Sequence, residues 1–578
     1  MPAFSDLGVL LGEVSRQQII HTTKNPLKAQ NKVLKKIVRR NKNCELGQKL
    51  NLKDVHSIKD YQDTVPLSTY ADYEPYVDRM MNNGEKRLMF NGINVRYASS
   101  SGSVGKPKML PKSINDLWKM QCIGFSVSVT TAYHHLKNKG VRLKNQLGPL
   151  ALNLSGHKTP DGKMSNGAAQ IPLRALKPIL PFFCTSPLPL LFPNLEDKFD
   201  TSYLHLRFCL ENKKVTYLGS LVVTLLTQMF DYLEENWEML CDDIEKGIIN
   251  PNIDCPDYFR KKYEKKFKPN PERAAELRRE FEKGFDEPIA PRIWPNLQWA
   301  YGMMSSNLAV YADKLRKVIG PDVGIHIMGY AAAEGYFATP MELDAKDYVA
   351  IPYTVFFEFL PIDEDEEKAD DTVRPLLLNE IEVGKMYEII VTNFSGLYRY
   401  RIEDVIKVTG MYNNTPRIEL CYRQNLSMNV ANEKTTTDMT DAAVERIVNE
   451  VGVEYQGFSF YPDFTTKPPR YTLLIELKGE TNEEIRQALI EALDRAMDDI
   501  NEKWYKYRRW GMLGTPEVLF LKEKTYTDYN KYLADKGVVL NQIKPVTVIN
   551  NEEREQFFFS HVATDAPVVK EVLAKFEK

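Results

Sequence analysis

Apolar positions recur at helical spacing near the start of the chain. In residues 30–40 the apolar side chains stand close to three or four positions apart, with Lys and Arg between them, and this spacing predicts an amphipathic helix. Residues 118–136 are predicted to form another helix. The longest apolar tract, residues 215–230, contains five interspersed Ser, Thr and Gln residues and falls short of the ~20 residues of a membrane span. It is interpreted as a buried helix.

Strand patterns dominate residues 323–408. Four segments rich in β-branched and aromatic residues occur there, each bounded by Gly, Pro, Asn or acidic turns: GIHIMGY, YTVFFEFL, MYEIIVTN and DVIKVTG. The acidic run 363–371 is predicted to be a loop between two of these strands. Upstream, residues 256–285 are highly charged, and they are predicted to form a helical hairpin with a solvated face.

Helices and strands alternate after about residue 415. The predicted elements are helices at 438–451 and 482–503 and strands at 471–477 and 517–521. Together they span about 150 residues, which is the size of a small domain. The chain is therefore predicted to be an α/β protein, with a large N-terminal body of β-sheets and helices at residues 1–415 and a smaller C-terminal α+β lid domain at residues 425–578.

Composition indicates an ordinary globular protein of two or three domains. The 578 residues are 43% hydrophobic and 27% charged, with a formal net charge of −2. So balanced a charge gives no reason to expect a nucleic-acid backbone or an anionic membrane as partner, although local basic clusters remain. The seven cysteines are scattered without a CxxC pair, and no leader peptide is evident, so we expect a cytoplasmic location.

The segment YASSSGSVGKPK, residues 97–108, has the residues of a phosphate-binding loop. Its small residues let backbone N–H groups approach an anion, while its hydroxyl and ammonium groups supply further donors. It is not a Walker A loop, because its glycines are too close together and proline follows its first lysine. A surface turn is the alternative. Between an extended segment at 92–98 and the helix at 118–136, it predicts a strand, a turn and then a helix around an anion.

Three further segments present single charged side chains in a distinctive order. MGYAAAEGYF, residues 328–337, presents Glu334, and GLYRYRIEDVIKVTG, residues 396–410, presents Asp404. GVVLNQIKPV, near the C-terminus, presents Lys544. In this order and with these spacings, the chain resembles the auxin-responsive (Gretchen Hagen three) family of acyl-acid amido synthetases, a branch of the adenylate-forming enzymes. The resemblance covers nearly the whole chain.

The resemblance implies a ligase that uses ATP and Mg²⁺. Such an enzyme activates a carboxylic acid as an acyl-adenylate and then transfers the acyl group to an amine, with an amino acid as the expected acceptor. An acyl-CoA-forming ligase is the alternative among enzymes, because it shares the first half-reaction. The alternative from another class is an ATP-binding protein with little turnover.

The resemblance also implies roles for individual residues. The β- and γ-phosphates are expected on Ser100, Ser101, Gly102, Ser103, Gly105 and Lys108. Tyr330 is expected against the adenine and Asp404 on the ribose hydroxyls. Glu334 is expected to hold Mg²⁺, which prefers oxygen ligands. Lys544 is expected to place its charge at the reacting carboxylate and α-phosphate, where two anions must be brought together.

Arg423 and Lys434 are further candidate nucleotide contacts near the hinge between the two domains. The chain departs from the family pattern at three positions. Val104 stands where a hydroxyl residue or glycine is usual, Ala333 where a hydroxyl residue is usual, and Glu403 where glycine is usual. Two hydroxyl donors are thereby missing around the phosphates, and each lost hydrogen bond to a charged group costs about 1.5–3 kcal/mol.

Each assignment has a structural alternative. Glu334 would then lie in the first turn of a helix. Asp404 would only pair with Arg399 or Arg401, and Lys544 would be solvated, like most lysines.

Overall fold

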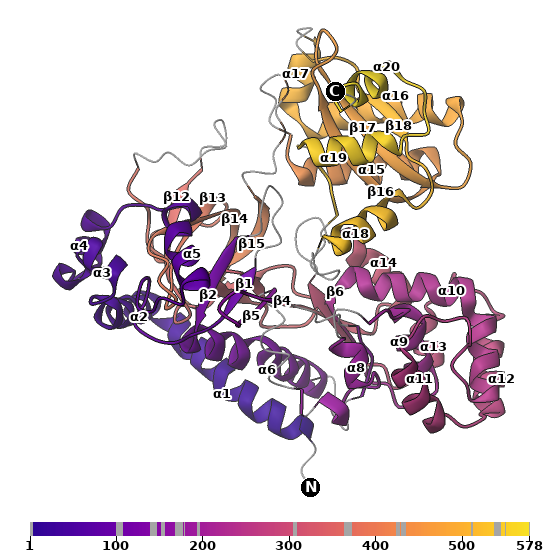
Figure 1. The fold of residues 1–578 in the computed structure, drawn as a ribbon, viewed down its shortest axis with the longest axis horizontal. Coiled ribbons are helices and arrows are strands. Elements are labelled where there is room, and N and C mark those ends of the chain that lie inside the picture. Colours follow the sequence, from indigo (N-terminus) through magenta and orange to yellow (C-terminus); the bar gives the residue numbers. More distant parts are fainter. Residues whose placement is uncertain are drawn as a thin grey trace.

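Four β-sheets organise the described part of the chain (Figure 1). The computed structural model describes residues 4–99, 108–138, 147–151, 157–167, 177–178, 180–193, 197–303, 309–362, 373–423, 428, 430, 435–509, 513–536, 545–549 and 551–576. Three of the sheets belong to an N-terminal body and one belongs to a C-terminal lobe.

The largest sheet is antiparallel, with strand order β12-β13-β14-β15-β11-β10-β9. Its strands are β9 (Tyr330–Ala332), β10 (Gly335–Thr339), β11 (Tyr348–Ala350), β12 (Phe356–Pro361), β13 (Met386–Thr392), β14 (Tyr400–Tyr412) and β15 (Thr415–Arg423). Three of the four predicted strand segments lie here and are confirmed. The sheet shares a core with α2 (Pro26–Asn41), which confirms the predicted N-terminal amphipathic helix.

A mixed sheet, in the order β2-β1-β5-β4, carries the predicted phosphate loop. Its strands are β1 (Asn94–Ser99), β2 (Met109–Ser113), β4 (His157–Lys158) and β5 (Met164–Gly167). Because Ser99 pairs with Met109 in antiparallel register, residues 100–107 connect two adjacent strands. The predicted order of strand, turn and helix is therefore corrected: β2 stands between the loop and α6 (Ile114–Asn138).

The third sheet is parallel, in the order β3-β6-β7-β8. Its strands are β3 (Leu150–Ala151), β6 (Tyr217–Val222), β7 (Trp299–Met303) and β8 (Gly324–Ile327), and β8 confirms the fourth predicted strand. The predicted helix at 215–230 is wrong in its first half, which is β6; α10 (Val223–Lys246) begins only afterwards. A strand buried on both faces is a continuous apolar run, which periodicity does not separate from a buried helix.

Helices cover this parallel sheet (Figure 1). They are α8 (Leu188–Leu191), α9 (Thr201–Leu210), α10, α11 (Asp257–Tyr263), α12 (Pro271–Phe281), α13 (Ile289–Ile293) and α14 (Ala309–Ile319). The predicted charged hairpin is α11 and α12, but its solvated interpretation is only partly right. Arg273 of α12 is buried, and its guanidinium donates to Leu210 O and Ile293 O, both at 2.8 Å. Arg273 therefore has a structural role, although its charge led the sequence analysis to predict a solvated side chain.

The N-terminal helices lie along the other side of the body (Figure 1). Besides α2 they are α1 (Phe4–Lys24), α3 (Glu45–Lys49), α4 (Ile58–Thr64) and α5 (Glu74–Asn82). The α1 helix packs closely on α6, because a Cβ at Gly12 would stand only 2.0 Å from Ser126 O. Thr130 Oγ1 also donates to Val9 O at 3.0 Å.

The C-terminal lobe is a three-stranded sheet with helices (Figure 1). It contains α15 (Thr437–Val451), β16 (Glu454–Asp463), β17 (Arg470–Lys478), α16 (Glu483–Ile500), α17 (Glu502–Arg509), β18 (Glu517–Phe520), α18 (Thr525–Asp535), α19 (Glu552–Ser560) and α20 (Pro567–Leu573). The predicted elements are confirmed, except that the long helix breaks at Asn501, and β16, α18, α19 and α20 were not predicted.

The two lobes touch at α14, where Lys314 Nζ lies 5.6 Å from the centre of the Tyr455 ring. The body sheet continues to the end of β15 at Arg423, and the first helix of the lobe starts at Thr437. Among the described helices, none has the length and apolar character that crossing a bilayer requires.

Candidate active site

Tyr330 and Asp404 meet although 74 residues separate them in the sequence. The Tyr330 hydroxyl donates a hydrogen bond of 2.6 Å to Asp404 Oδ2. Tyr330 opens the edge strand β9, whereas Asp404 lies within β14, and both side chains are buried. The sheet thus joins two residues that the sequence analysis placed on the same nucleotide. Arg423 is the register partner of Asp404 on β15.

The two arginines near Asp404 pair with other carboxylates. Arg399 Nη2 lies 3.0 Å from Glu358 Oε1 on β12, and Arg401 Nη2 lies 2.6 Å from Glu388 Oε2 on β13. The Arg401 pair joins the neighbouring strands β14 and β13, whereas the Arg399 pair reaches from the residue before β14 across to β12, and both pairs are buried or nearly so. Both arginines thus have a carboxylate partner other than Asp404.

Glu334 occupies the turn between β9 and β10. It is 5% exposed, and Ala332 pairs with Gly335 on either side of it. The alternative that Glu334 begins a helix is therefore wrong. Asn393 Nδ2 donates to Glu334 O at 2.8 Å, which ties the turn to the connection between β13 and β14. Because Asn393 Oδ1 also accepts from Ser395 N at 2.9 Å, this connection is itself held in place.

A buried lysine that the sequence analysis missed lies near Glu334. Lys112, on β2, has no exposed surface, and its Nζ has no hydrogen-bond partner within the described part of the chain. Burial lowers the pKa of Lys112, and the charges of Asp116 and Glu334 oppose that shift. Asp116 in turn accepts a hydrogen bond from Ser395 Oγ. The segment MLPKS around Lys112 gave no signal of this burial in the sequence.

Lys119, near the start of α6, is a second lysine close to Asp116. Its Nζ donates to Tyr353 O at 2.7 Å and Thr354 O at 2.8 Å and lies 3.8 Å from the centre of the Phe394 ring. Burial lowers the pKa of Lys119 to about 7, against the opposing charge of Asp116. Asp116 thus acts on the charges of both lysines, whereas Glu334 acts on that of Lys112.

Lys108 and Glu403 form the other charged contact of the site. Lys108 Nζ lies 3.9 Å from Glu403 Oε2. Glu403 has φ of 70°, in the left-handed region that favours glycine. The backbone at Glu403 therefore has a conformation that favours glycine, although the residue is a glutamate, and its carboxylate reaches Lys108 at the end of the phosphate loop.

The other predicted site residues lie outside the described residues. These are Ser100, Ser101, Gly102, Ser103, Gly105, Lys434 and Lys544. Only the backbone of Arg423 is described. The described part of the site is therefore Lys108, Tyr330, Glu334 and Asp404, with Lys112 and Asp116 beside it.

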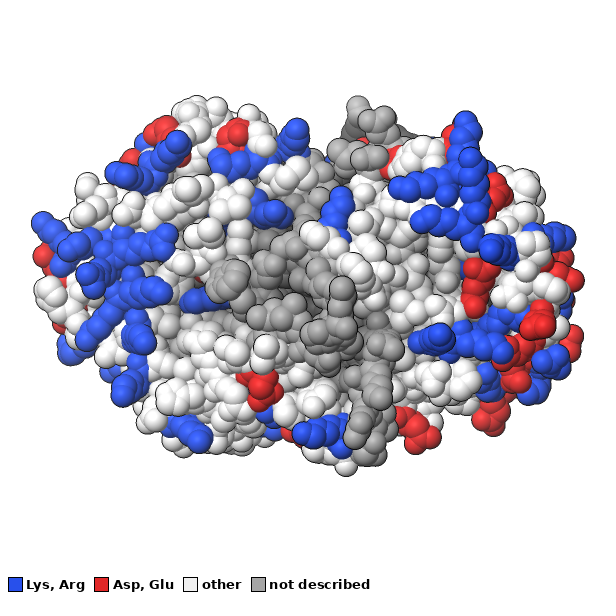
Figure 2. Space-filling view, turned by 90° about the horizontal axis from the view of Figure 1, so that it is seen from below, with Lys and Arg blue, Asp and Glu red and all other residues white. Residues whose placement is uncertain are grey.

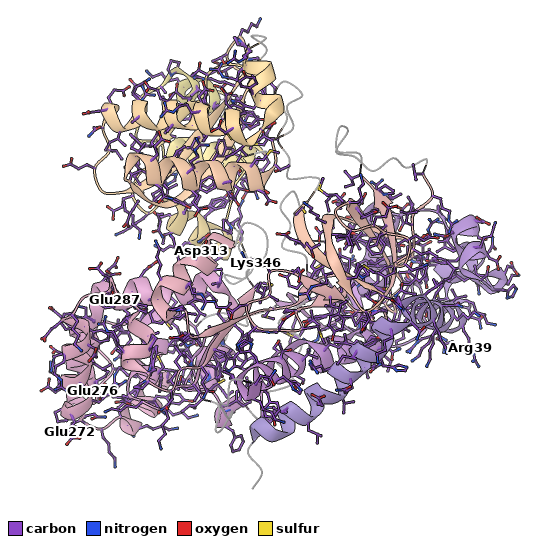
Figure 3. The ribbon with its side chains drawn as sticks, turned by 180° about the vertical axis from the view of Figure 1, so that it is seen from behind. Arg39, Glu272, Glu276, Glu287, Asp313 and Lys346 are labelled. Atoms are coloured by element: carbon purple, nitrogen blue, oxygen red, sulfur yellow. The ribbon has the colours of Figure 1, made fainter. Side chains whose placement is uncertain are left out.

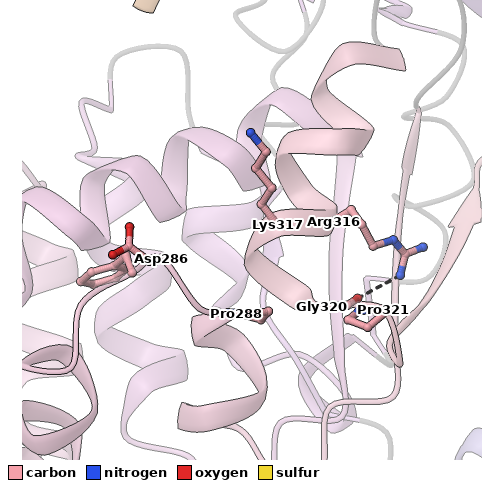
Figure 4. A pocket seen from close by; sticks show the side chains of 7 residues that line it. Asp286, Pro288, Arg316, Lys317, Gly320 and Pro321 are labelled. Atoms are coloured by element: carbon pink, nitrogen blue, oxygen red, sulfur yellow. Dashed lines mark hydrogen bonds between the residues drawn. The ribbon is translucent and has the colours of Figure 1, made fainter. Parts of the chain in front are cut away.

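A surface pocket of about 470 Å³ lies elsewhere, between the start of α13 and the end of α14 (Figure 4). Arg316, which lines it, is already engaged with Gly320 O at 3.0 Å, Val323 O at 2.6 Å and Asp344 Oδ1 at 2.6 Å. Phe285, Pro288 and Pro321 supply much of the remaining wall. Arg316 therefore serves the surrounding fold, and Asp286 and Lys317 are the other charged residues of the pocket.

The donor set at Glu334 fits a magnesium ion shared with phosphates. Within the described ranges, no three His, Cys, Asp or Glu side chains gather as a metal cluster. Mg²⁺ is commonly held by one or two carboxylates together with substrate phosphates. Glu334 supplies a single buried carboxylate. It lies close enough to Lys112 to act on its charge, and Lys112 is on β2, a strand that borders the phosphate loop. This arrangement is compatible with such a shared site.

Comparison with known proteins places the chain in a family. Sequence models of the GH3 family match in order: the N-terminal domain at residues 15–323, the central domain at 348–423 and the C-terminal domain at 438–553. A jasmonoyl–L-amino acid synthetase of Oryza sativa subsp. japonica is 26% identical, over 91% of this chain and 93% of the relative. A putative indole-3-acetic acid-amido synthetase of Arabidopsis thaliana is 25% identical, over 94% and 96%.

Solved structures show the same fold. A GH3.15 acyl acid amido synthetase superposes with a TM-score of 0.79 at 24% identity, covering 94% of this chain and 95% of that one. A 2-hydroxyisobutyryl-CoA ligase in the postadenylation state has a TM-score of 0.50 at 9% identity, covering 96% and 92%. The predicted fold, a large adenylate-forming body with a smaller C-terminal domain, is confirmed. The chain belongs to the GH3 family of acyl-acid amido synthetases.

Proposed function

We propose that this protein joins a carboxylic acid to an amino acid in two half-reactions at the site around Asp404. In the first, an oxygen of the carboxylate attacks the α-phosphorus of ATP and the bond to the β-phosphate breaks. This step forms the acyl-adenylate and releases pyrophosphate. In the second, the amino nitrogen attacks the acyl carbon, the bond to the AMP oxygen breaks, and the amine loses a proton. The products are an amide and AMP.

The nucleotide is oriented by the two residues that share a hydrogen bond. Asp404 accepts hydrogen bonds from the ribose hydroxyls, and Tyr330 lies against the adenine while its hydroxyl fixes the Asp404 carboxylate. Arg423 and Lys434 add positive charge at the nucleotide from the hinge. Fixing the ribose matters because the rate of attack depends on holding the α-phosphorus in line with the carboxylate.

The phosphates are held by the loop after β1. Ser100, Ser101, Gly102, Ser103, Gly105 and Lys108 surround the departing pyrophosphate. Glu334 would hold Mg²⁺, which when bound would neutralise phosphate charge and stabilise the leaving group. Lys544, on the C-terminal lobe from about residue 425 onwards, brings its charge to the reacting carboxylate when that lobe closes as a lid. Fixed charges aimed at the developing charge of the transition state usually contribute more to the rate than any other single effect.

The observation that supports the proposal most directly is the hydrogen bond between Tyr330 and Asp404. It brings two separate sequence motifs into one site, and Glu334 follows Tyr330 by a single tight turn of the same sheet. Neither a core role nor ordinary surface pairing requires that a tyrosine, an aspartate and a buried glutamate from these motifs converge.

The decisive experiment measures pyrophosphate release from purified protein with ATP and Mg²⁺ across a panel of carboxylic acids. Each acid is tested alone, with pooled amino acids and with coenzyme A, and products are identified by mass. Release that depends on an acid, together with amide formation, is expected. Thioester formation instead would make the protein an acyl-CoA-forming ligase. ATP binding without release from any acid would make it a nucleotide-binding protein with little turnover.

A further inference from the structure

The exposed side of α2 carries only positive charge. This helix has six Lys and Arg residues and no acidic residue. We use the name basic face for its exposed cations: Lys28, Lys32, Lys35, Lys36 and Arg39. Figure 2 shows Lys and Arg gathered at the end of the molecule where α2 lies in Figure 1, with few acidic side chains among them. Arg39 lies at this outer edge, whereas Glu272 and Glu276 lie at the opposite end (Figure 3).

The basic face costs the isolated helix stability. Lys28 and Lys32, Lys32 and Lys36, and Lys35 and Arg39 are like charges at i,i+4, and each such pair destabilises a helix by about 0.2–0.5 kcal/mol. Within the described part of the chain, none of the five cations of the basic face forms an ion pair with a carboxylate. The opposite side of α2 is buried against the large sheet and holds the helix in place. The charge of the basic face is therefore not neutralised within the described fold.

Protruding aliphatic side chains border the basic face. Arg40, at the C-terminal end of α2, donates from Nε to Asn91 O at 2.9 Å, so the chain before β1 lies against the helix. Two residues on, Ile93 is 78% exposed. Ile114 is 61% exposed and directly follows Ser113, the register partner of Asn94. The two isoleucines therefore flank the same end of the β1–β2 pair, near the last turn of α2.

This combination distinguishes between anionic partners. Single-stranded nucleic acid is bound by cations together with exposed aromatic rings on which bases stack. The large exposed aromatic side chains of the described residues are Phe182, Tyr258, Phe464 and Tyr505, none of which lies on α2, β1 or the start of α6. Cations beside protruding aliphatic side chains instead fit an anionic lipid surface, where the cations meet headgroups and the aliphatic groups enter the acyl boundary.

We propose that the basic face of α2, with Ile93 and Ile114, docks this protein reversibly onto a membrane surface that contains anionic lipid headgroups. The proposal is independent of the reaction proposed above. The net charge of −2 does not oppose it, because surface charges more than about a Debye length away, roughly 8–10 Å, are largely screened. Docking of this kind would hold the protein at the surface of the bilayer.

The test compares binding of the full chain to phosphatidylcholine vesicles with and without phosphatidylserine, by co-sedimentation at low and at physiological salt. We expect binding only with phosphatidylserine and weaker binding at higher salt. The variant carries Lys28→Gln, Lys32→Gln, Lys35→Gln and Arg39→Gln, all at exposed positions. Because each cation near such a surface contributes on the order of 1 kcal/mol, its partition coefficient should fall roughly a hundredfold or more.

A matched control changes four exposed lysines elsewhere: Lys261→Gln, Lys262→Gln, Lys265→Gln and Lys268→Gln. It has the same net charge as the α2 variant and should bind vesicles like the natural chain. Ile93→Ser, with unchanged charge, should weaken binding several-fold. Far-ultraviolet circular dichroism and acid-dependent pyrophosphate release should stay unchanged in all variants.

Several outcomes would overturn the proposal. One is failure of the natural chain to bind vesicles with phosphatidylserine, and another is equal loss of binding in the control. A third is that the α2 variant loses affinity for a single-stranded RNA while its vesicle binding is unchanged. That result would mean that the basic face binds a nucleic acid and not a membrane.

Discussion

The Tyr330 hydroxyl donates a 2.6 Å hydrogen bond to Asp404 Oδ2, and this bond joins the edge strand β9 to the long strand β14. It fixes the orientation of the carboxylate that we propose holds the ribose. A hydrogen bond to a charged group contributes about 1.5–3 kcal/mol. The tyrosine therefore has two separable effects, one on the fold and one on nucleotide affinity.

The first prediction concerns Tyr330→Phe. Loss of the hydroxyl leaves Asp404 less well oriented, so the Kd for ATP should rise roughly tenfold or more, which isothermal titration calorimetry can measure. Tyr61→Phe is the matched control, because its buried hydroxyl bonds the neutral Thr392 Oγ1 at 2.7 Å. The control should lower stability without changing ATP affinity. If both variants raise the Kd for ATP equally, Asp404 is not part of the nucleotide site.

The second prediction concerns the strained residue Glu403. At φ of 70°, a side chain costs roughly 1–2 kcal/mol that glycine avoids. Glu403→Gly should therefore raise the free energy of unfolding by about 1 kcal/mol and tighten ATP binding, because Lys108 loses its carboxylate partner.

Glu403→Gln separates the two effects of that substitution. It removes the charge but keeps the Cβ, so it should tighten ATP binding without the gain in stability. Urea unfolding and calorimetry measure the two quantities. Weaker ATP binding in both variants would show that Glu403 itself assists the nucleotide.

The third prediction concerns the proposed magnesium ligand. Glu334→Gln keeps the shape of the turn, since Asn393 Nδ2 holds the backbone carbonyl and not the carboxylate. The Mg²⁺ concentration that gives half-maximal pyrophosphate release should rise at least about tenfold. Asp116→Asn is the control, because Asp116 also acts on Lys112 but is not expected to bind metal. If both variants keep the natural Mg²⁺ dependence, the metal role of Glu334 is wrong.

The fourth prediction is a pH dependence at Asp441 of α15. Burial raises its pKa to about 8, with further contributions from Asp438 and Glu445, and within the described residues neither carboxylate oxygen has a hydrogen-bond partner. The unfolded state ionises near pH 4, so the folded state loses stability as pH rises from about 4 to about 8. Asp441→Asn should unfold at a higher temperature than the natural chain at pH 8.

That difference should shrink towards zero as the pH approaches 4. Asp438→Asn offers a graded comparison, because burial raises the pKa of Asp438 only to about 6. Its stability gain should be smaller and should be complete at lower pH. A gain for Asp441→Asn that is the same at pH 4 and pH 8 would show that ionisation is not its cause.

The fifth prediction concerns the buried pair of Glu358 and Arg399. Removing one partner strands a buried charge, so Glu358→Ala should lower the free energy of unfolding by about 3–5 kcal/mol. Asp63→Ala removes the exposed partner of Lys59, and it should change stability by less than about 1 kcal/mol. Equal losses in urea unfolding would mean that burial does not set the strength of these pairs.

Several features of the site could be predicted from the sequence and others could not. The order of motifs around Glu334 and Asp404 identified the family, because small residues and single charges occur there in a distinctive arrangement. Lys112 gave no comparable signal, since lysines are almost always exposed. Its burial results from the pairing of β2 with β1 and from packing against α6, which are contacts between separate elements.

The fold shows the same division. The periodicity of residues 30–40 correctly predicted α2, because a helix that buries one face must repeat its apolar residues every three or four positions. The run at 215–230 was ambiguous, because a central parallel strand and a buried helix are both continuously apolar. The first half of this run is a strand, β6, because it pairs with β3 on one side and with β7 on the other.

The sequence by itself determined the local elements and the chemistry of each motif, because both depend on the residue types and spacing within short segments. The tertiary structure decided which motifs meet: Tyr330 with Asp404, Lys108 with Glu403, and Lys112 near Glu334. It also decided that the cations of α2 stay without carboxylate partners within the described fold and gather at one end of the molecule. These relations depend on the register of strands far apart in the chain, and that register is set by the packing of the whole core.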